Sequence, residues 1–85
     1  MKAFVYFYLM KDEPESILPT IQSHVAYWKE RDLEDYRGGP FSDRSGGLIM
    51  FSAKDLESAN ATVEGDPFIQ NDLIDRKWVN EWCPE

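Results

Sequence analysis

The pattern of apolar and polar positions predicts six secondary-structure elements, beginning with a strand at about residues 3–10. That stretch, AFVYFYLM, is dense in aromatic and β-branched residues, which is typical of a strand. Side chains alternate between the two faces of a strand, so Phe4, Tyr6 and Tyr8 point one way. The intervening residues are also apolar and point the other way, so both faces need cover. In a chain this short, helices can cover one face, and we expect a second copy of the chain to cover the other.

A helix is expected next, because apolar residues recur at intervals of three and four positions. These residues are Ile17, Ile21, Val25 and Trp28. Ser16 suits the N-cap position, and Pro19 then falls in the first turn, where no intrahelical hydrogen bond is lost. At about 100° per residue, His24 lies on the edge of the apolar stripe and Tyr27 lies beside it.

The remaining elements are two strands, a helix and a strand. They are a short strand in YRGGPF, an apolar strand at about 47–53, a helix at about 54–64 and a last strand at about 75–82. Ser52 to Asp55 resembles a capping box that would start the second helix, and Gly65 would end it. The order β-α-β-β-α-β predicts an α+β, ferredoxin-like fold with a four-stranded antiparallel sheet, in one domain over residues 1–85.

Length and charge exclude several classes of function. Eighty-five residues form one domain with little room for an enclosed active site. The net charge is −7, so neither nucleic acid nor an anionic membrane surface is an expected partner. No stretch approaches the ~20 apolar residues of a membrane span, and MKAFVYFYLM lacks the cleavage site of a leader, so we expect a cytoplasmic protein. One cysteine and one histidine cannot assemble a tetrahedral zinc site, and we expect no metal or other cofactor.

The only histidine and one aspartate are candidates for chemistry, and each also has a structural explanation. Imidazole titrates nearest to neutral pH, so His24 could act as a general acid or base, or could be a partly buried side chain hydrogen-bonded to a neighbour. Asp66 stands in EGDPFI between Gly65 and Pro67. An aspartate before a proline is a common N-cap, because proline suits the first helical position. One carboxylate oxygen could cap the turn while the other faces an imidazole.

Aromatic residues and glycines could line a ligand site. Four tyrosine hydroxyls could orient a polar ligand, although such side chains are often core edges or interfaces. They belong to Tyr6, Tyr8, Tyr27 and Tyr36. The glycines of Gly38-Gly39-Pro40 could let a ligand approach the backbone, or could simply form a bulge or turn. This segment lacks the spacing of a phosphate-binding loop.

Taken together, these residues resemble the YCII-related (YciI-like) family of small ferredoxin-like proteins. The resemblance rests on the order and spacing of His24-Val-Ala-Tyr27, Gly39-Pro40 and Asp66-Pro67-Phe68, after an N-terminal aromatic strand. It covers nearly the whole chain. The stretch RDLED, residues 31–35, is more charged than the short glycine-containing turn that the family commonly has, and this leaves the pocket wall and the substrate open.

The resemblance implies a set of site residues and an assembly. In this family the helix-one histidine and the Asp-Pro-Phe aspartate are thought to form a dyad, which here would be His24 as general acid or base and Asp66 as its orienting partner. Gly39, Pro40 and Phe68 would join the four tyrosines as ligand-binding residues. The family is typically dimeric, in the manner of dimeric α/β barrels, so we expect a homodimer through the sheet face.

The resemblance also implies a class of reaction. Degradative members of the dehydrochlorinase type, and the structurally similar muconolactone isomerases, imply a small proton-transfer enzyme of the lyase or isomerase type. Its ligand would be a small cyclic or aromatic organic molecule. The alternative is a dimeric ligand-binding or interaction module without catalysis. A cofactor-free oxygenase is a weaker third interpretation, because nothing in the sequence indicates oxygen chemistry.

Overall fold

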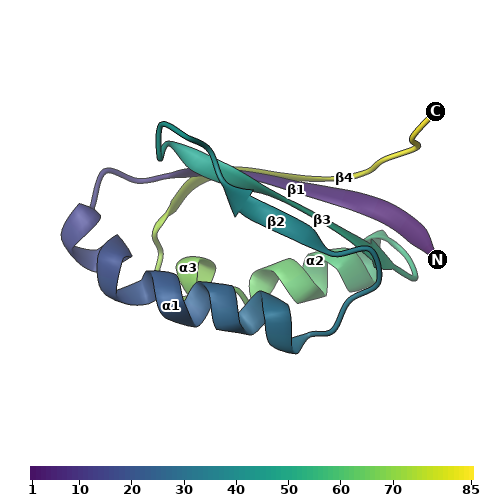
Figure 1. Cartoon of the computed structure of the whole chain (residues 1–85), viewed down its shortest axis with the longest axis horizontal. Coiled ribbons are helices and arrows are strands. Elements are labelled where there is room, and N and C mark those ends of the chain that lie inside the picture. Colours follow the sequence, from purple (N-terminus) through teal and green to yellow (C-terminus); the bar gives the residue numbers. More distant parts are fainter.

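A computed structural model describes all residues, 1–85, and shows one sheet with helices packed on one of its sides (Figure 1). The elements, in chain order, are β1 (Lys2–Met10), α1 (Pro14–Glu30), β2 (Arg37–Pro40), β3 (Gly46–Ala53), α2 (Leu56–Glu64), α3 (Pro67–Gln70) and β4 (Ile74–Glu81). The strand order is β2-β3-β1-β4, and all neighbouring strands are antiparallel. The predicted ferredoxin-like α+β fold with its four-stranded antiparallel sheet is therefore confirmed.

The core lies between the sheet and the helices. Register pairs Phe4 of β1 with Phe51 of β3, and Tyr6 with Ile49. All four side chains are almost completely buried. The helices complete this core with Trp28, Ala59, Val63 and Phe68. Because side chains alternate along a strand, every second residue of β1 is held against the helices.

The other face of the sheet carries no helix (Figure 1). On this open face Phe7 of β1 is paired with Trp78 of β4, and their rings meet edge-on with centroids 5.1 Å apart. Phe7 is 36% exposed and Trp78 is 41% exposed. Val5, Leu48 and Met50 share the open face and are half-buried. The first strand is thus apolar on both faces, as the sequence predicts, but the chain itself covers only one.

The start of α1 differs from the prediction. The helix begins at Pro14, and Glu13 occupies the N-cap position without a side-chain hydrogen bond. Proline is favoured at the first helical position, where its missing N–H has no helical partner to lose. Ser16 is therefore inside the helix and is not its cap, and Pro19 lies beyond the first turn. The helix is longer at its start than expected. Its buried side also differs from the predicted stripe, because His24 and Trp28 are buried whereas Val25 is 39% exposed.

The start of α2 also differs from the prediction, whereas its end at Glu64, directly before Gly65, is as predicted. Asp55, and not Ser52, caps its start, because the Asp55 carboxylate accepts a hydrogen bond of 2.8 Å from the Ser58 N–H. At the other end Gly65 has an ordinary right-handed helical conformation, so a positive φ is not the reason for a glycine. A side-chain carbon at this position would stand 2.3 Å from the Tyr27 hydroxyl. The close approach of α1 to the end of α2 therefore requires the glycine.

Candidate active site

His24 and Asp66 lie side by side, although 42 residues separate them in the sequence. His24 is in the second half of α1, and Asp66 is the N-cap of α3. The Nδ1 atom of His24 is 2.9 Å from each carboxylate oxygen of Asp66. The Asp66 side chain is completely buried, and the His24 side chain is 11% exposed. The structure therefore brings together the two residues that the sequence singles out.

The conformation of EGDPFI explains how Asp66 reaches this place. Asp66 is extended, with φ −60° and ψ 128°, and Pro67 is the first residue of α3. The Oδ1 atom accepts a hydrogen bond of 2.8 Å from the Phe68 N–H, which is the predicted N-cap interaction. Because the same carboxylate also contacts His24, Asp66 is both a cap and the partner of an imidazole. The sequence allowed Asp66 to be an N-cap or the partner of an imidazole, and in the structure it is both.

A third donor reaches the same carboxylate. The indole Nε1 of Trp28, one turn after His24 on α1, donates to Oδ2 of Asp66 at 2.8 Å. A buried carboxylate needs such donors, because its removal from water is otherwise strongly unfavourable. Both oxygens already accept from N–H groups. The carboxylate therefore acts as an acceptor toward the imidazole, and Nδ1 of His24 carries a proton.

Aromatic rings hold the imidazole of His24 in place. Phe68 stacks on it with ring centroids 4.1 Å apart and an interplanar angle of 12°, and Tyr8 meets it edge-on at 5.9 Å. The Nε2 atom makes no hydrogen bond within the chain. Among completely buried side-chain nitrogen and oxygen atoms, only the Tyr6 hydroxyl lacks a hydrogen-bond partner. Since Nε2 also lacks a partner, it is not completely buried. His24 thus has one ring nitrogen without a hydrogen-bond partner inside the chain.

Tyr6 and Tyr8 lie on the helix-facing side of β1, near the His24–Asp66 pair. Their ring centroids are 5.0 Å apart, and both side chains are buried. Burial raises the pKa of both phenols, and the negative charge of Asp66 raises the pKa further. Both hydroxyls therefore stay protonated through neutral pH and can donate a hydrogen bond. The hydroxyl of Tyr6 has no acceptor within the protein.

Tyr36 and Tyr27 are placed differently from each other. Tyr36 stacks on Trp28 with centroids 6.4 Å apart, and burial raises its pKa with a contribution from the charge of Asp66. The Tyr27 hydroxyl donates to the Thr62 carbonyl and so ties α1 to α2. Burial raises the pKa of Tyr27, and the nearby Arg31 opposes this. Tyr36 thus contacts Trp28, whose indole donates to Asp66, whereas the Tyr27 hydroxyl already has an acceptor in Thr62. Ligand binding by Tyr36 or Tyr27 stays a prediction.

Gly39 and Pro40 lie in the edge strand β2. Register pairs Gly39 with Leu48 on the open face, and Pro40 with Gly47 on the helix-facing side. Nothing lies within 4 Å of the position that a side-chain carbon would take at Gly39. At Gly47 that position is 2.4 Å from the Tyr8 hydroxyl. The glycine that makes room for a phenol beside the dyad is therefore Gly47, which the sequence did not predict as a site residue.

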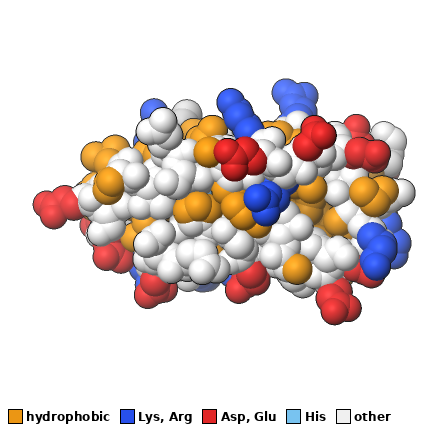
Figure 2. Space-filling model, turned by 90° about the horizontal axis from the view of Figure 1, so that it is seen from below, with side chains coloured by type: hydrophobic (Ala, Val, Ile, Leu, Met, Phe, Trp, Pro, Cys, Tyr) orange, Lys and Arg blue, Asp and Glu red, His pale blue; other side chains and the backbone are white.

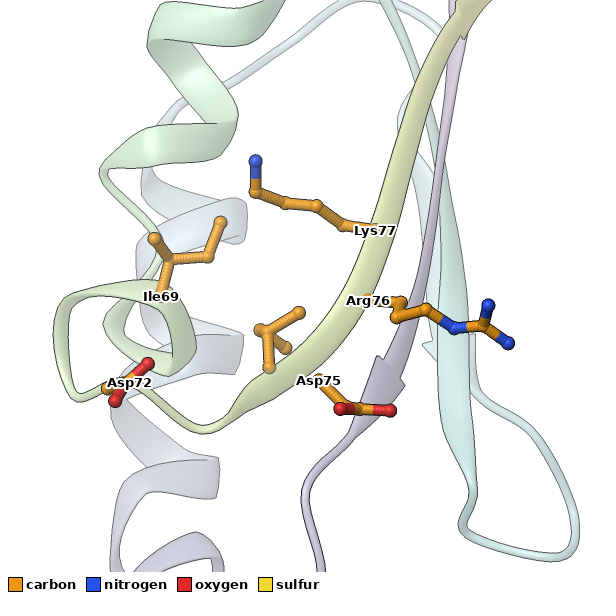
Figure 3. A pocket seen from close by; sticks show the side chains of 6 residues that line it. Ile69, Asp72, Asp75, Arg76 and Lys77 are labelled. Carbon is orange, nitrogen blue, oxygen red and sulfur yellow. The ribbon is translucent and has the colours of Figure 1, made fainter.

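Two surface pockets lie away from the dyad. One of about 180 Å³ lies between α3 and β4, and its lining residues are Ile69, Asp72, Ile74, Asp75, Arg76 and Lys77 (Figure 3). Lys77 points toward the helices and Arg76 to the other side of the strand. The second pocket, of about 290 Å³, lies where β1 ends and α1 begins, and Lys11 and Arg44 are among its lining residues. Neither pocket is lined by His24 or Asp66, so neither is the site of the dyad.

The helix side of the surface combines acidic and apolar side chains. Figure 2 shows this side: Asp and Glu lie at its edges and on its upper part, Lys and Arg lie at its top, right and centre, and apolar side chains lie between them. No group of three or more His, Cys, Asp or Glu is placed to hold a metal ion. None of the three helices combines the length and the apolar character that a membrane crossing needs.

Trp28 is the residue of the site that the sequence interpretation missed. It was expected only as part of the apolar stripe of the first helix. Two signals were available: Trp28 stands four positions after His24, on the same helix face, and a buried indole N–H usually finds an acceptor. Neither signal identifies Asp66 as the acceptor, because Asp66 is 38 residues further along the chain.

The fold and the site together define a class of small ferredoxin-like α+β proteins with a buried histidine–aspartate pair on the helix side of the sheet. Residues 1–83 match the profile of the YCII-related domain. The chain therefore belongs to the YCII-related family, and the resemblance found in the sequence is confirmed. No curated protein sequence matches the chain.

Solved structures with the same fold include one enzyme with a bound ligand. A 5-chloro-2-hydroxyhydroquinone dehydrochlorinase (TftG) from Burkholderia phenoliruptrix AC1100, in complex with 2,5-dihydroxybenzoquinone, is similar over 95% of this chain and 93% of its own, with a TM-score of 0.80 and 19% identity. An antibiotic biosynthesis monooxygenase is similar over 100% and 99%, with a TM-score of 0.65 and 13% identity. A protein from Mycobacterium tuberculosis gives a TM-score of 0.55 at 14% identity, over 98% and 93%. At these identities the similarity shows the fold.

Proposed function

We propose that this protein is a small proton-transfer enzyme, a lyase or isomerase, acting on a small cyclic or aromatic molecule that carries oxygen substituents. The observation that carries the proposal is the pairing of His24 with a completely buried carboxylate at 2.9 Å. In the neutral imidazole, this pairing favours the tautomer in which Nδ1 carries the proton and Nε2 carries a lone pair. A fixed tautomer with one reachable nitrogen is what general acid–base catalysis needs.

In the proposed reaction His24 acts first as a base and then as an acid. Nε2 takes a proton from the substrate, and the buried Asp66 stabilises the imidazolium that forms. In an isomerase the proton returns to another atom of the same molecule. In a lyase that removes hydrogen chloride, the electron pair of the broken bond to hydrogen forms a new double bond. Chloride leaves with the electron pair of the carbon–chlorine bond, and His24 releases its proton to solvent.

The phenols beside the dyad support an oxygen-bearing substrate. Tyr6 and Tyr8 keep their protons because burial and the charge of Asp66 raise their pKa values. The Tyr8 hydroxyl would donate to a carbonyl or oxyanion of the substrate, whereas the Tyr6 hydroxyl is completely buried in the chain. Phe68 and Tyr36 would contribute apolar wall to the same site. The similarity to the dehydrochlorinase, whose structure holds 2,5-dihydroxybenzoquinone, supports a hydroxylated ring as the substrate.

The proposal includes a homodimer through the open face of the sheet. Phe7 and Trp78 expose apolar rings there, next to the half-buried Val5, Leu48 and Met50. Large apolar patches on a protein surface usually mark an interaction site. A second copy brings the same face, and two such faces cover one another, as in a symmetric dimer.

The proposed function is tested by anaerobic incubation with 5-chloro-2-hydroxyhydroquinone, followed by measurement of chloride release. We expect release by the wild-type protein above the buffer rate, and a loss of at least a hundredfold in the His24→Gln variant, in line with the usual contribution of a general base. Leu18→Gln, on the exposed side of α1, is the matched control, because Leu18 is 69% exposed. Equal rates for wild type and His24→Gln would remove His24 from the reaction.

A second candidate is a ligand-binding module without catalysis. The limited exposure of His24 and the position of both pockets away from the dyad favour this candidate. It predicts that 2,5-dihydroxybenzoquinone raises the melting temperature of the protein while chlorinated and unchlorinated rings are recovered unchanged. The first candidate predicts binding together with turnover of the chlorinated ring.

A further inference from the structure

We propose that Trp28 is a positioning residue, which acts on the reaction through the Asp66 carboxylate and does not touch the ligand. This inference rests on the proposed function, since a positioning residue affects catalysis only where the dyad transfers protons. Its starting point is the hydrogen bond of 2.8 Å from the indole Nε1 of Trp28 to Oδ2 of Asp66. The oxygen that accepts this hydrogen bond also contacts Nδ1 of His24.

The indole is a rigid donor because aromatic rings pack on it. Tyr6 stacks on Trp28 with centroids 6.0 Å apart and an angle of 28°, and Tyr36 stacks on it at 6.4 Å and 7°. The Trp28 side chain is only 1% exposed. A side chain packed in this way has no second rotamer available. The direction of its N–H bond is therefore set by the core of the protein.

Two fixed donors determine how the carboxylate faces the imidazole. The Trp28 indole donates to Oδ2, and the backbone N–H of Phe68 donates to Oδ1. One donor comes from α1 and the other from α3. With one donor on each oxygen, the carboxylate group cannot rotate without breaking a charge-assisted hydrogen bond. This explains why both oxygens are equally distant, at 2.9 Å, from Nδ1 of His24.

The alternative is that the hydrogen bond only satisfies a buried indole N–H. Under that alternative, loss of the donor lowers the stability of the fold and leaves the His24–Asp66 contact as it was. Under our proposal, loss of the donor frees the carboxylate to rotate, so the contact with Nδ1 opens more often. The two explanations therefore differ in a property of His24, and not only in stability.

The test replaces Trp28 by benzothienylalanine, which keeps the bicyclic shape and has sulfur in place of the N–H, and by phenylalanine in a second variant. The first measurement is the rate at which the Nδ1 proton of His24 exchanges with water, followed by NMR. This measurement needs no substrate. The control is Tyr27→Phe, which removes the hydrogen bond from the neighbouring residue of α1 to Thr62 and does not touch Asp66.

We expect exchange of the Nδ1 proton to become about tenfold faster in the benzothienylalanine variant, which corresponds to about 1.4 kcal/mol, and to stay unchanged in Tyr27→Phe. On a substrate of the wild-type protein, we expect kcat to fall by about the same factor with little change in KM, because the ligand itself loses no contact. An unchanged exchange rate in both Trp28 variants would overturn the inference. If the wild-type protein turns over no substrate, the proposed function fails, while the exchange measurement still decides whether Trp28 positions the carboxylate.

Discussion

Replacing Asp66 by asparagine separates the capping role of this residue from its role as the partner of His24. Asparagine is as good an N-cap as aspartate, so its oxygen can still accept from the Phe68 N–H. The other oxygen becomes an NH₂ group, which is a donor. In the structure that oxygen accepts from the Trp28 indole and contacts Nδ1 of His24. In the Asp66→Asn variant the new NH₂ group therefore faces two other donors inside the core, the Trp28 indole N–H and Nδ1 of His24.

The cost of Asp66→Asn follows from these contacts. A hydrogen bond to a charged group contributes about 1.5–3 kcal/mol, and a buried donor left without an acceptor costs about 1–3 kcal/mol. His24 can relieve part of this by changing its tautomer and accepting from the new NH₂ group. We therefore expect the free energy of unfolding to fall by about 2–4 kcal/mol, out of the roughly 4–13 kcal/mol expected for 85 residues. The melting temperature would fall by roughly 10–30 °C.

The assay is urea unfolding at one fixed protein concentration, followed by far-ultraviolet circular dichroism and tryptophan fluorescence. A fixed concentration is needed because dimerisation shifts the apparent stability. Asp55→Asn is the matched control: Asp55 caps α2 through the Ser58 N–H and has no partner on another helix. We expect little change in the control. If the two substitutions lower stability equally, Asp66 is only a cap and our account of the site is wrong.

Three further predictions concern the interface, the helix contact and the phenols. Phe7→Glu places a carboxylate on the open face and is expected to convert a dimer to a monomer in sedimentation at micromolar concentration, whereas Leu18→Glu on α1 should leave the dimer intact. Gly65→Ala should lower the free energy of unfolding by about 1–3 kcal/mol through overpacking, and Tyr27→Phe in the same chain should recover part of that loss, since a side-chain carbon would stand 2.3 Å from the Tyr27 hydroxyl. Burial raises the pKa of Tyr6 above its ordinary 10.0, so the unfolded chain loses this proton first and stability falls as pH rises above about 10. Tyr6→Phe should make this fall shallower by up to about 1.4 kcal/mol per pH unit in urea melts, and an unchanged slope would contradict the burial of an un-ionised phenol.

Local signals predicted the parts of the fold that local physics determines. The aromatic and β-branched content of AFVYFYLM is enough to assign β1, and the period of two in a strand is enough to divide its residues between two faces. Helical spacing is enough to place His24 beside the apolar stripe of α1, but it does not predict that His24 is buried while Val25 is 39% exposed. The Gly-Asp-Pro order is enough to predict the cap at Asp66, because the residues involved are neighbours.

Contacts between distant segments could not be predicted from the same signals. The reason for Gly65 is the Tyr27 hydroxyl, which comes from another helix. The role of Trp28 depends on an acceptor 38 residues away. The start of α1 was misplaced because Ser16 and Pro14 both suit a helix start, and the chain uses the earlier one. The pairing of His24 with Asp66 was inferred from family resemblance, since neither residue indicates the other by its local sequence.

The central claim is that His24 presents an unprotonated Nε2 to a small hydroxylated ring while Asp66 holds the proton on Nδ1. Nitrogen NMR of labelled His24 with its imidazole in the neutral form, with and without 2,5-dihydroxybenzoquinone, tests this claim most directly. Our account predicts a protonated Nδ1 and an unprotonated Nε2 in the free protein, and a change in the Nε2 resonance when the ring compound binds. A free protein with the proton on Nε2, or an Nε2 resonance that saturating ligand leaves unmoved, would contradict it.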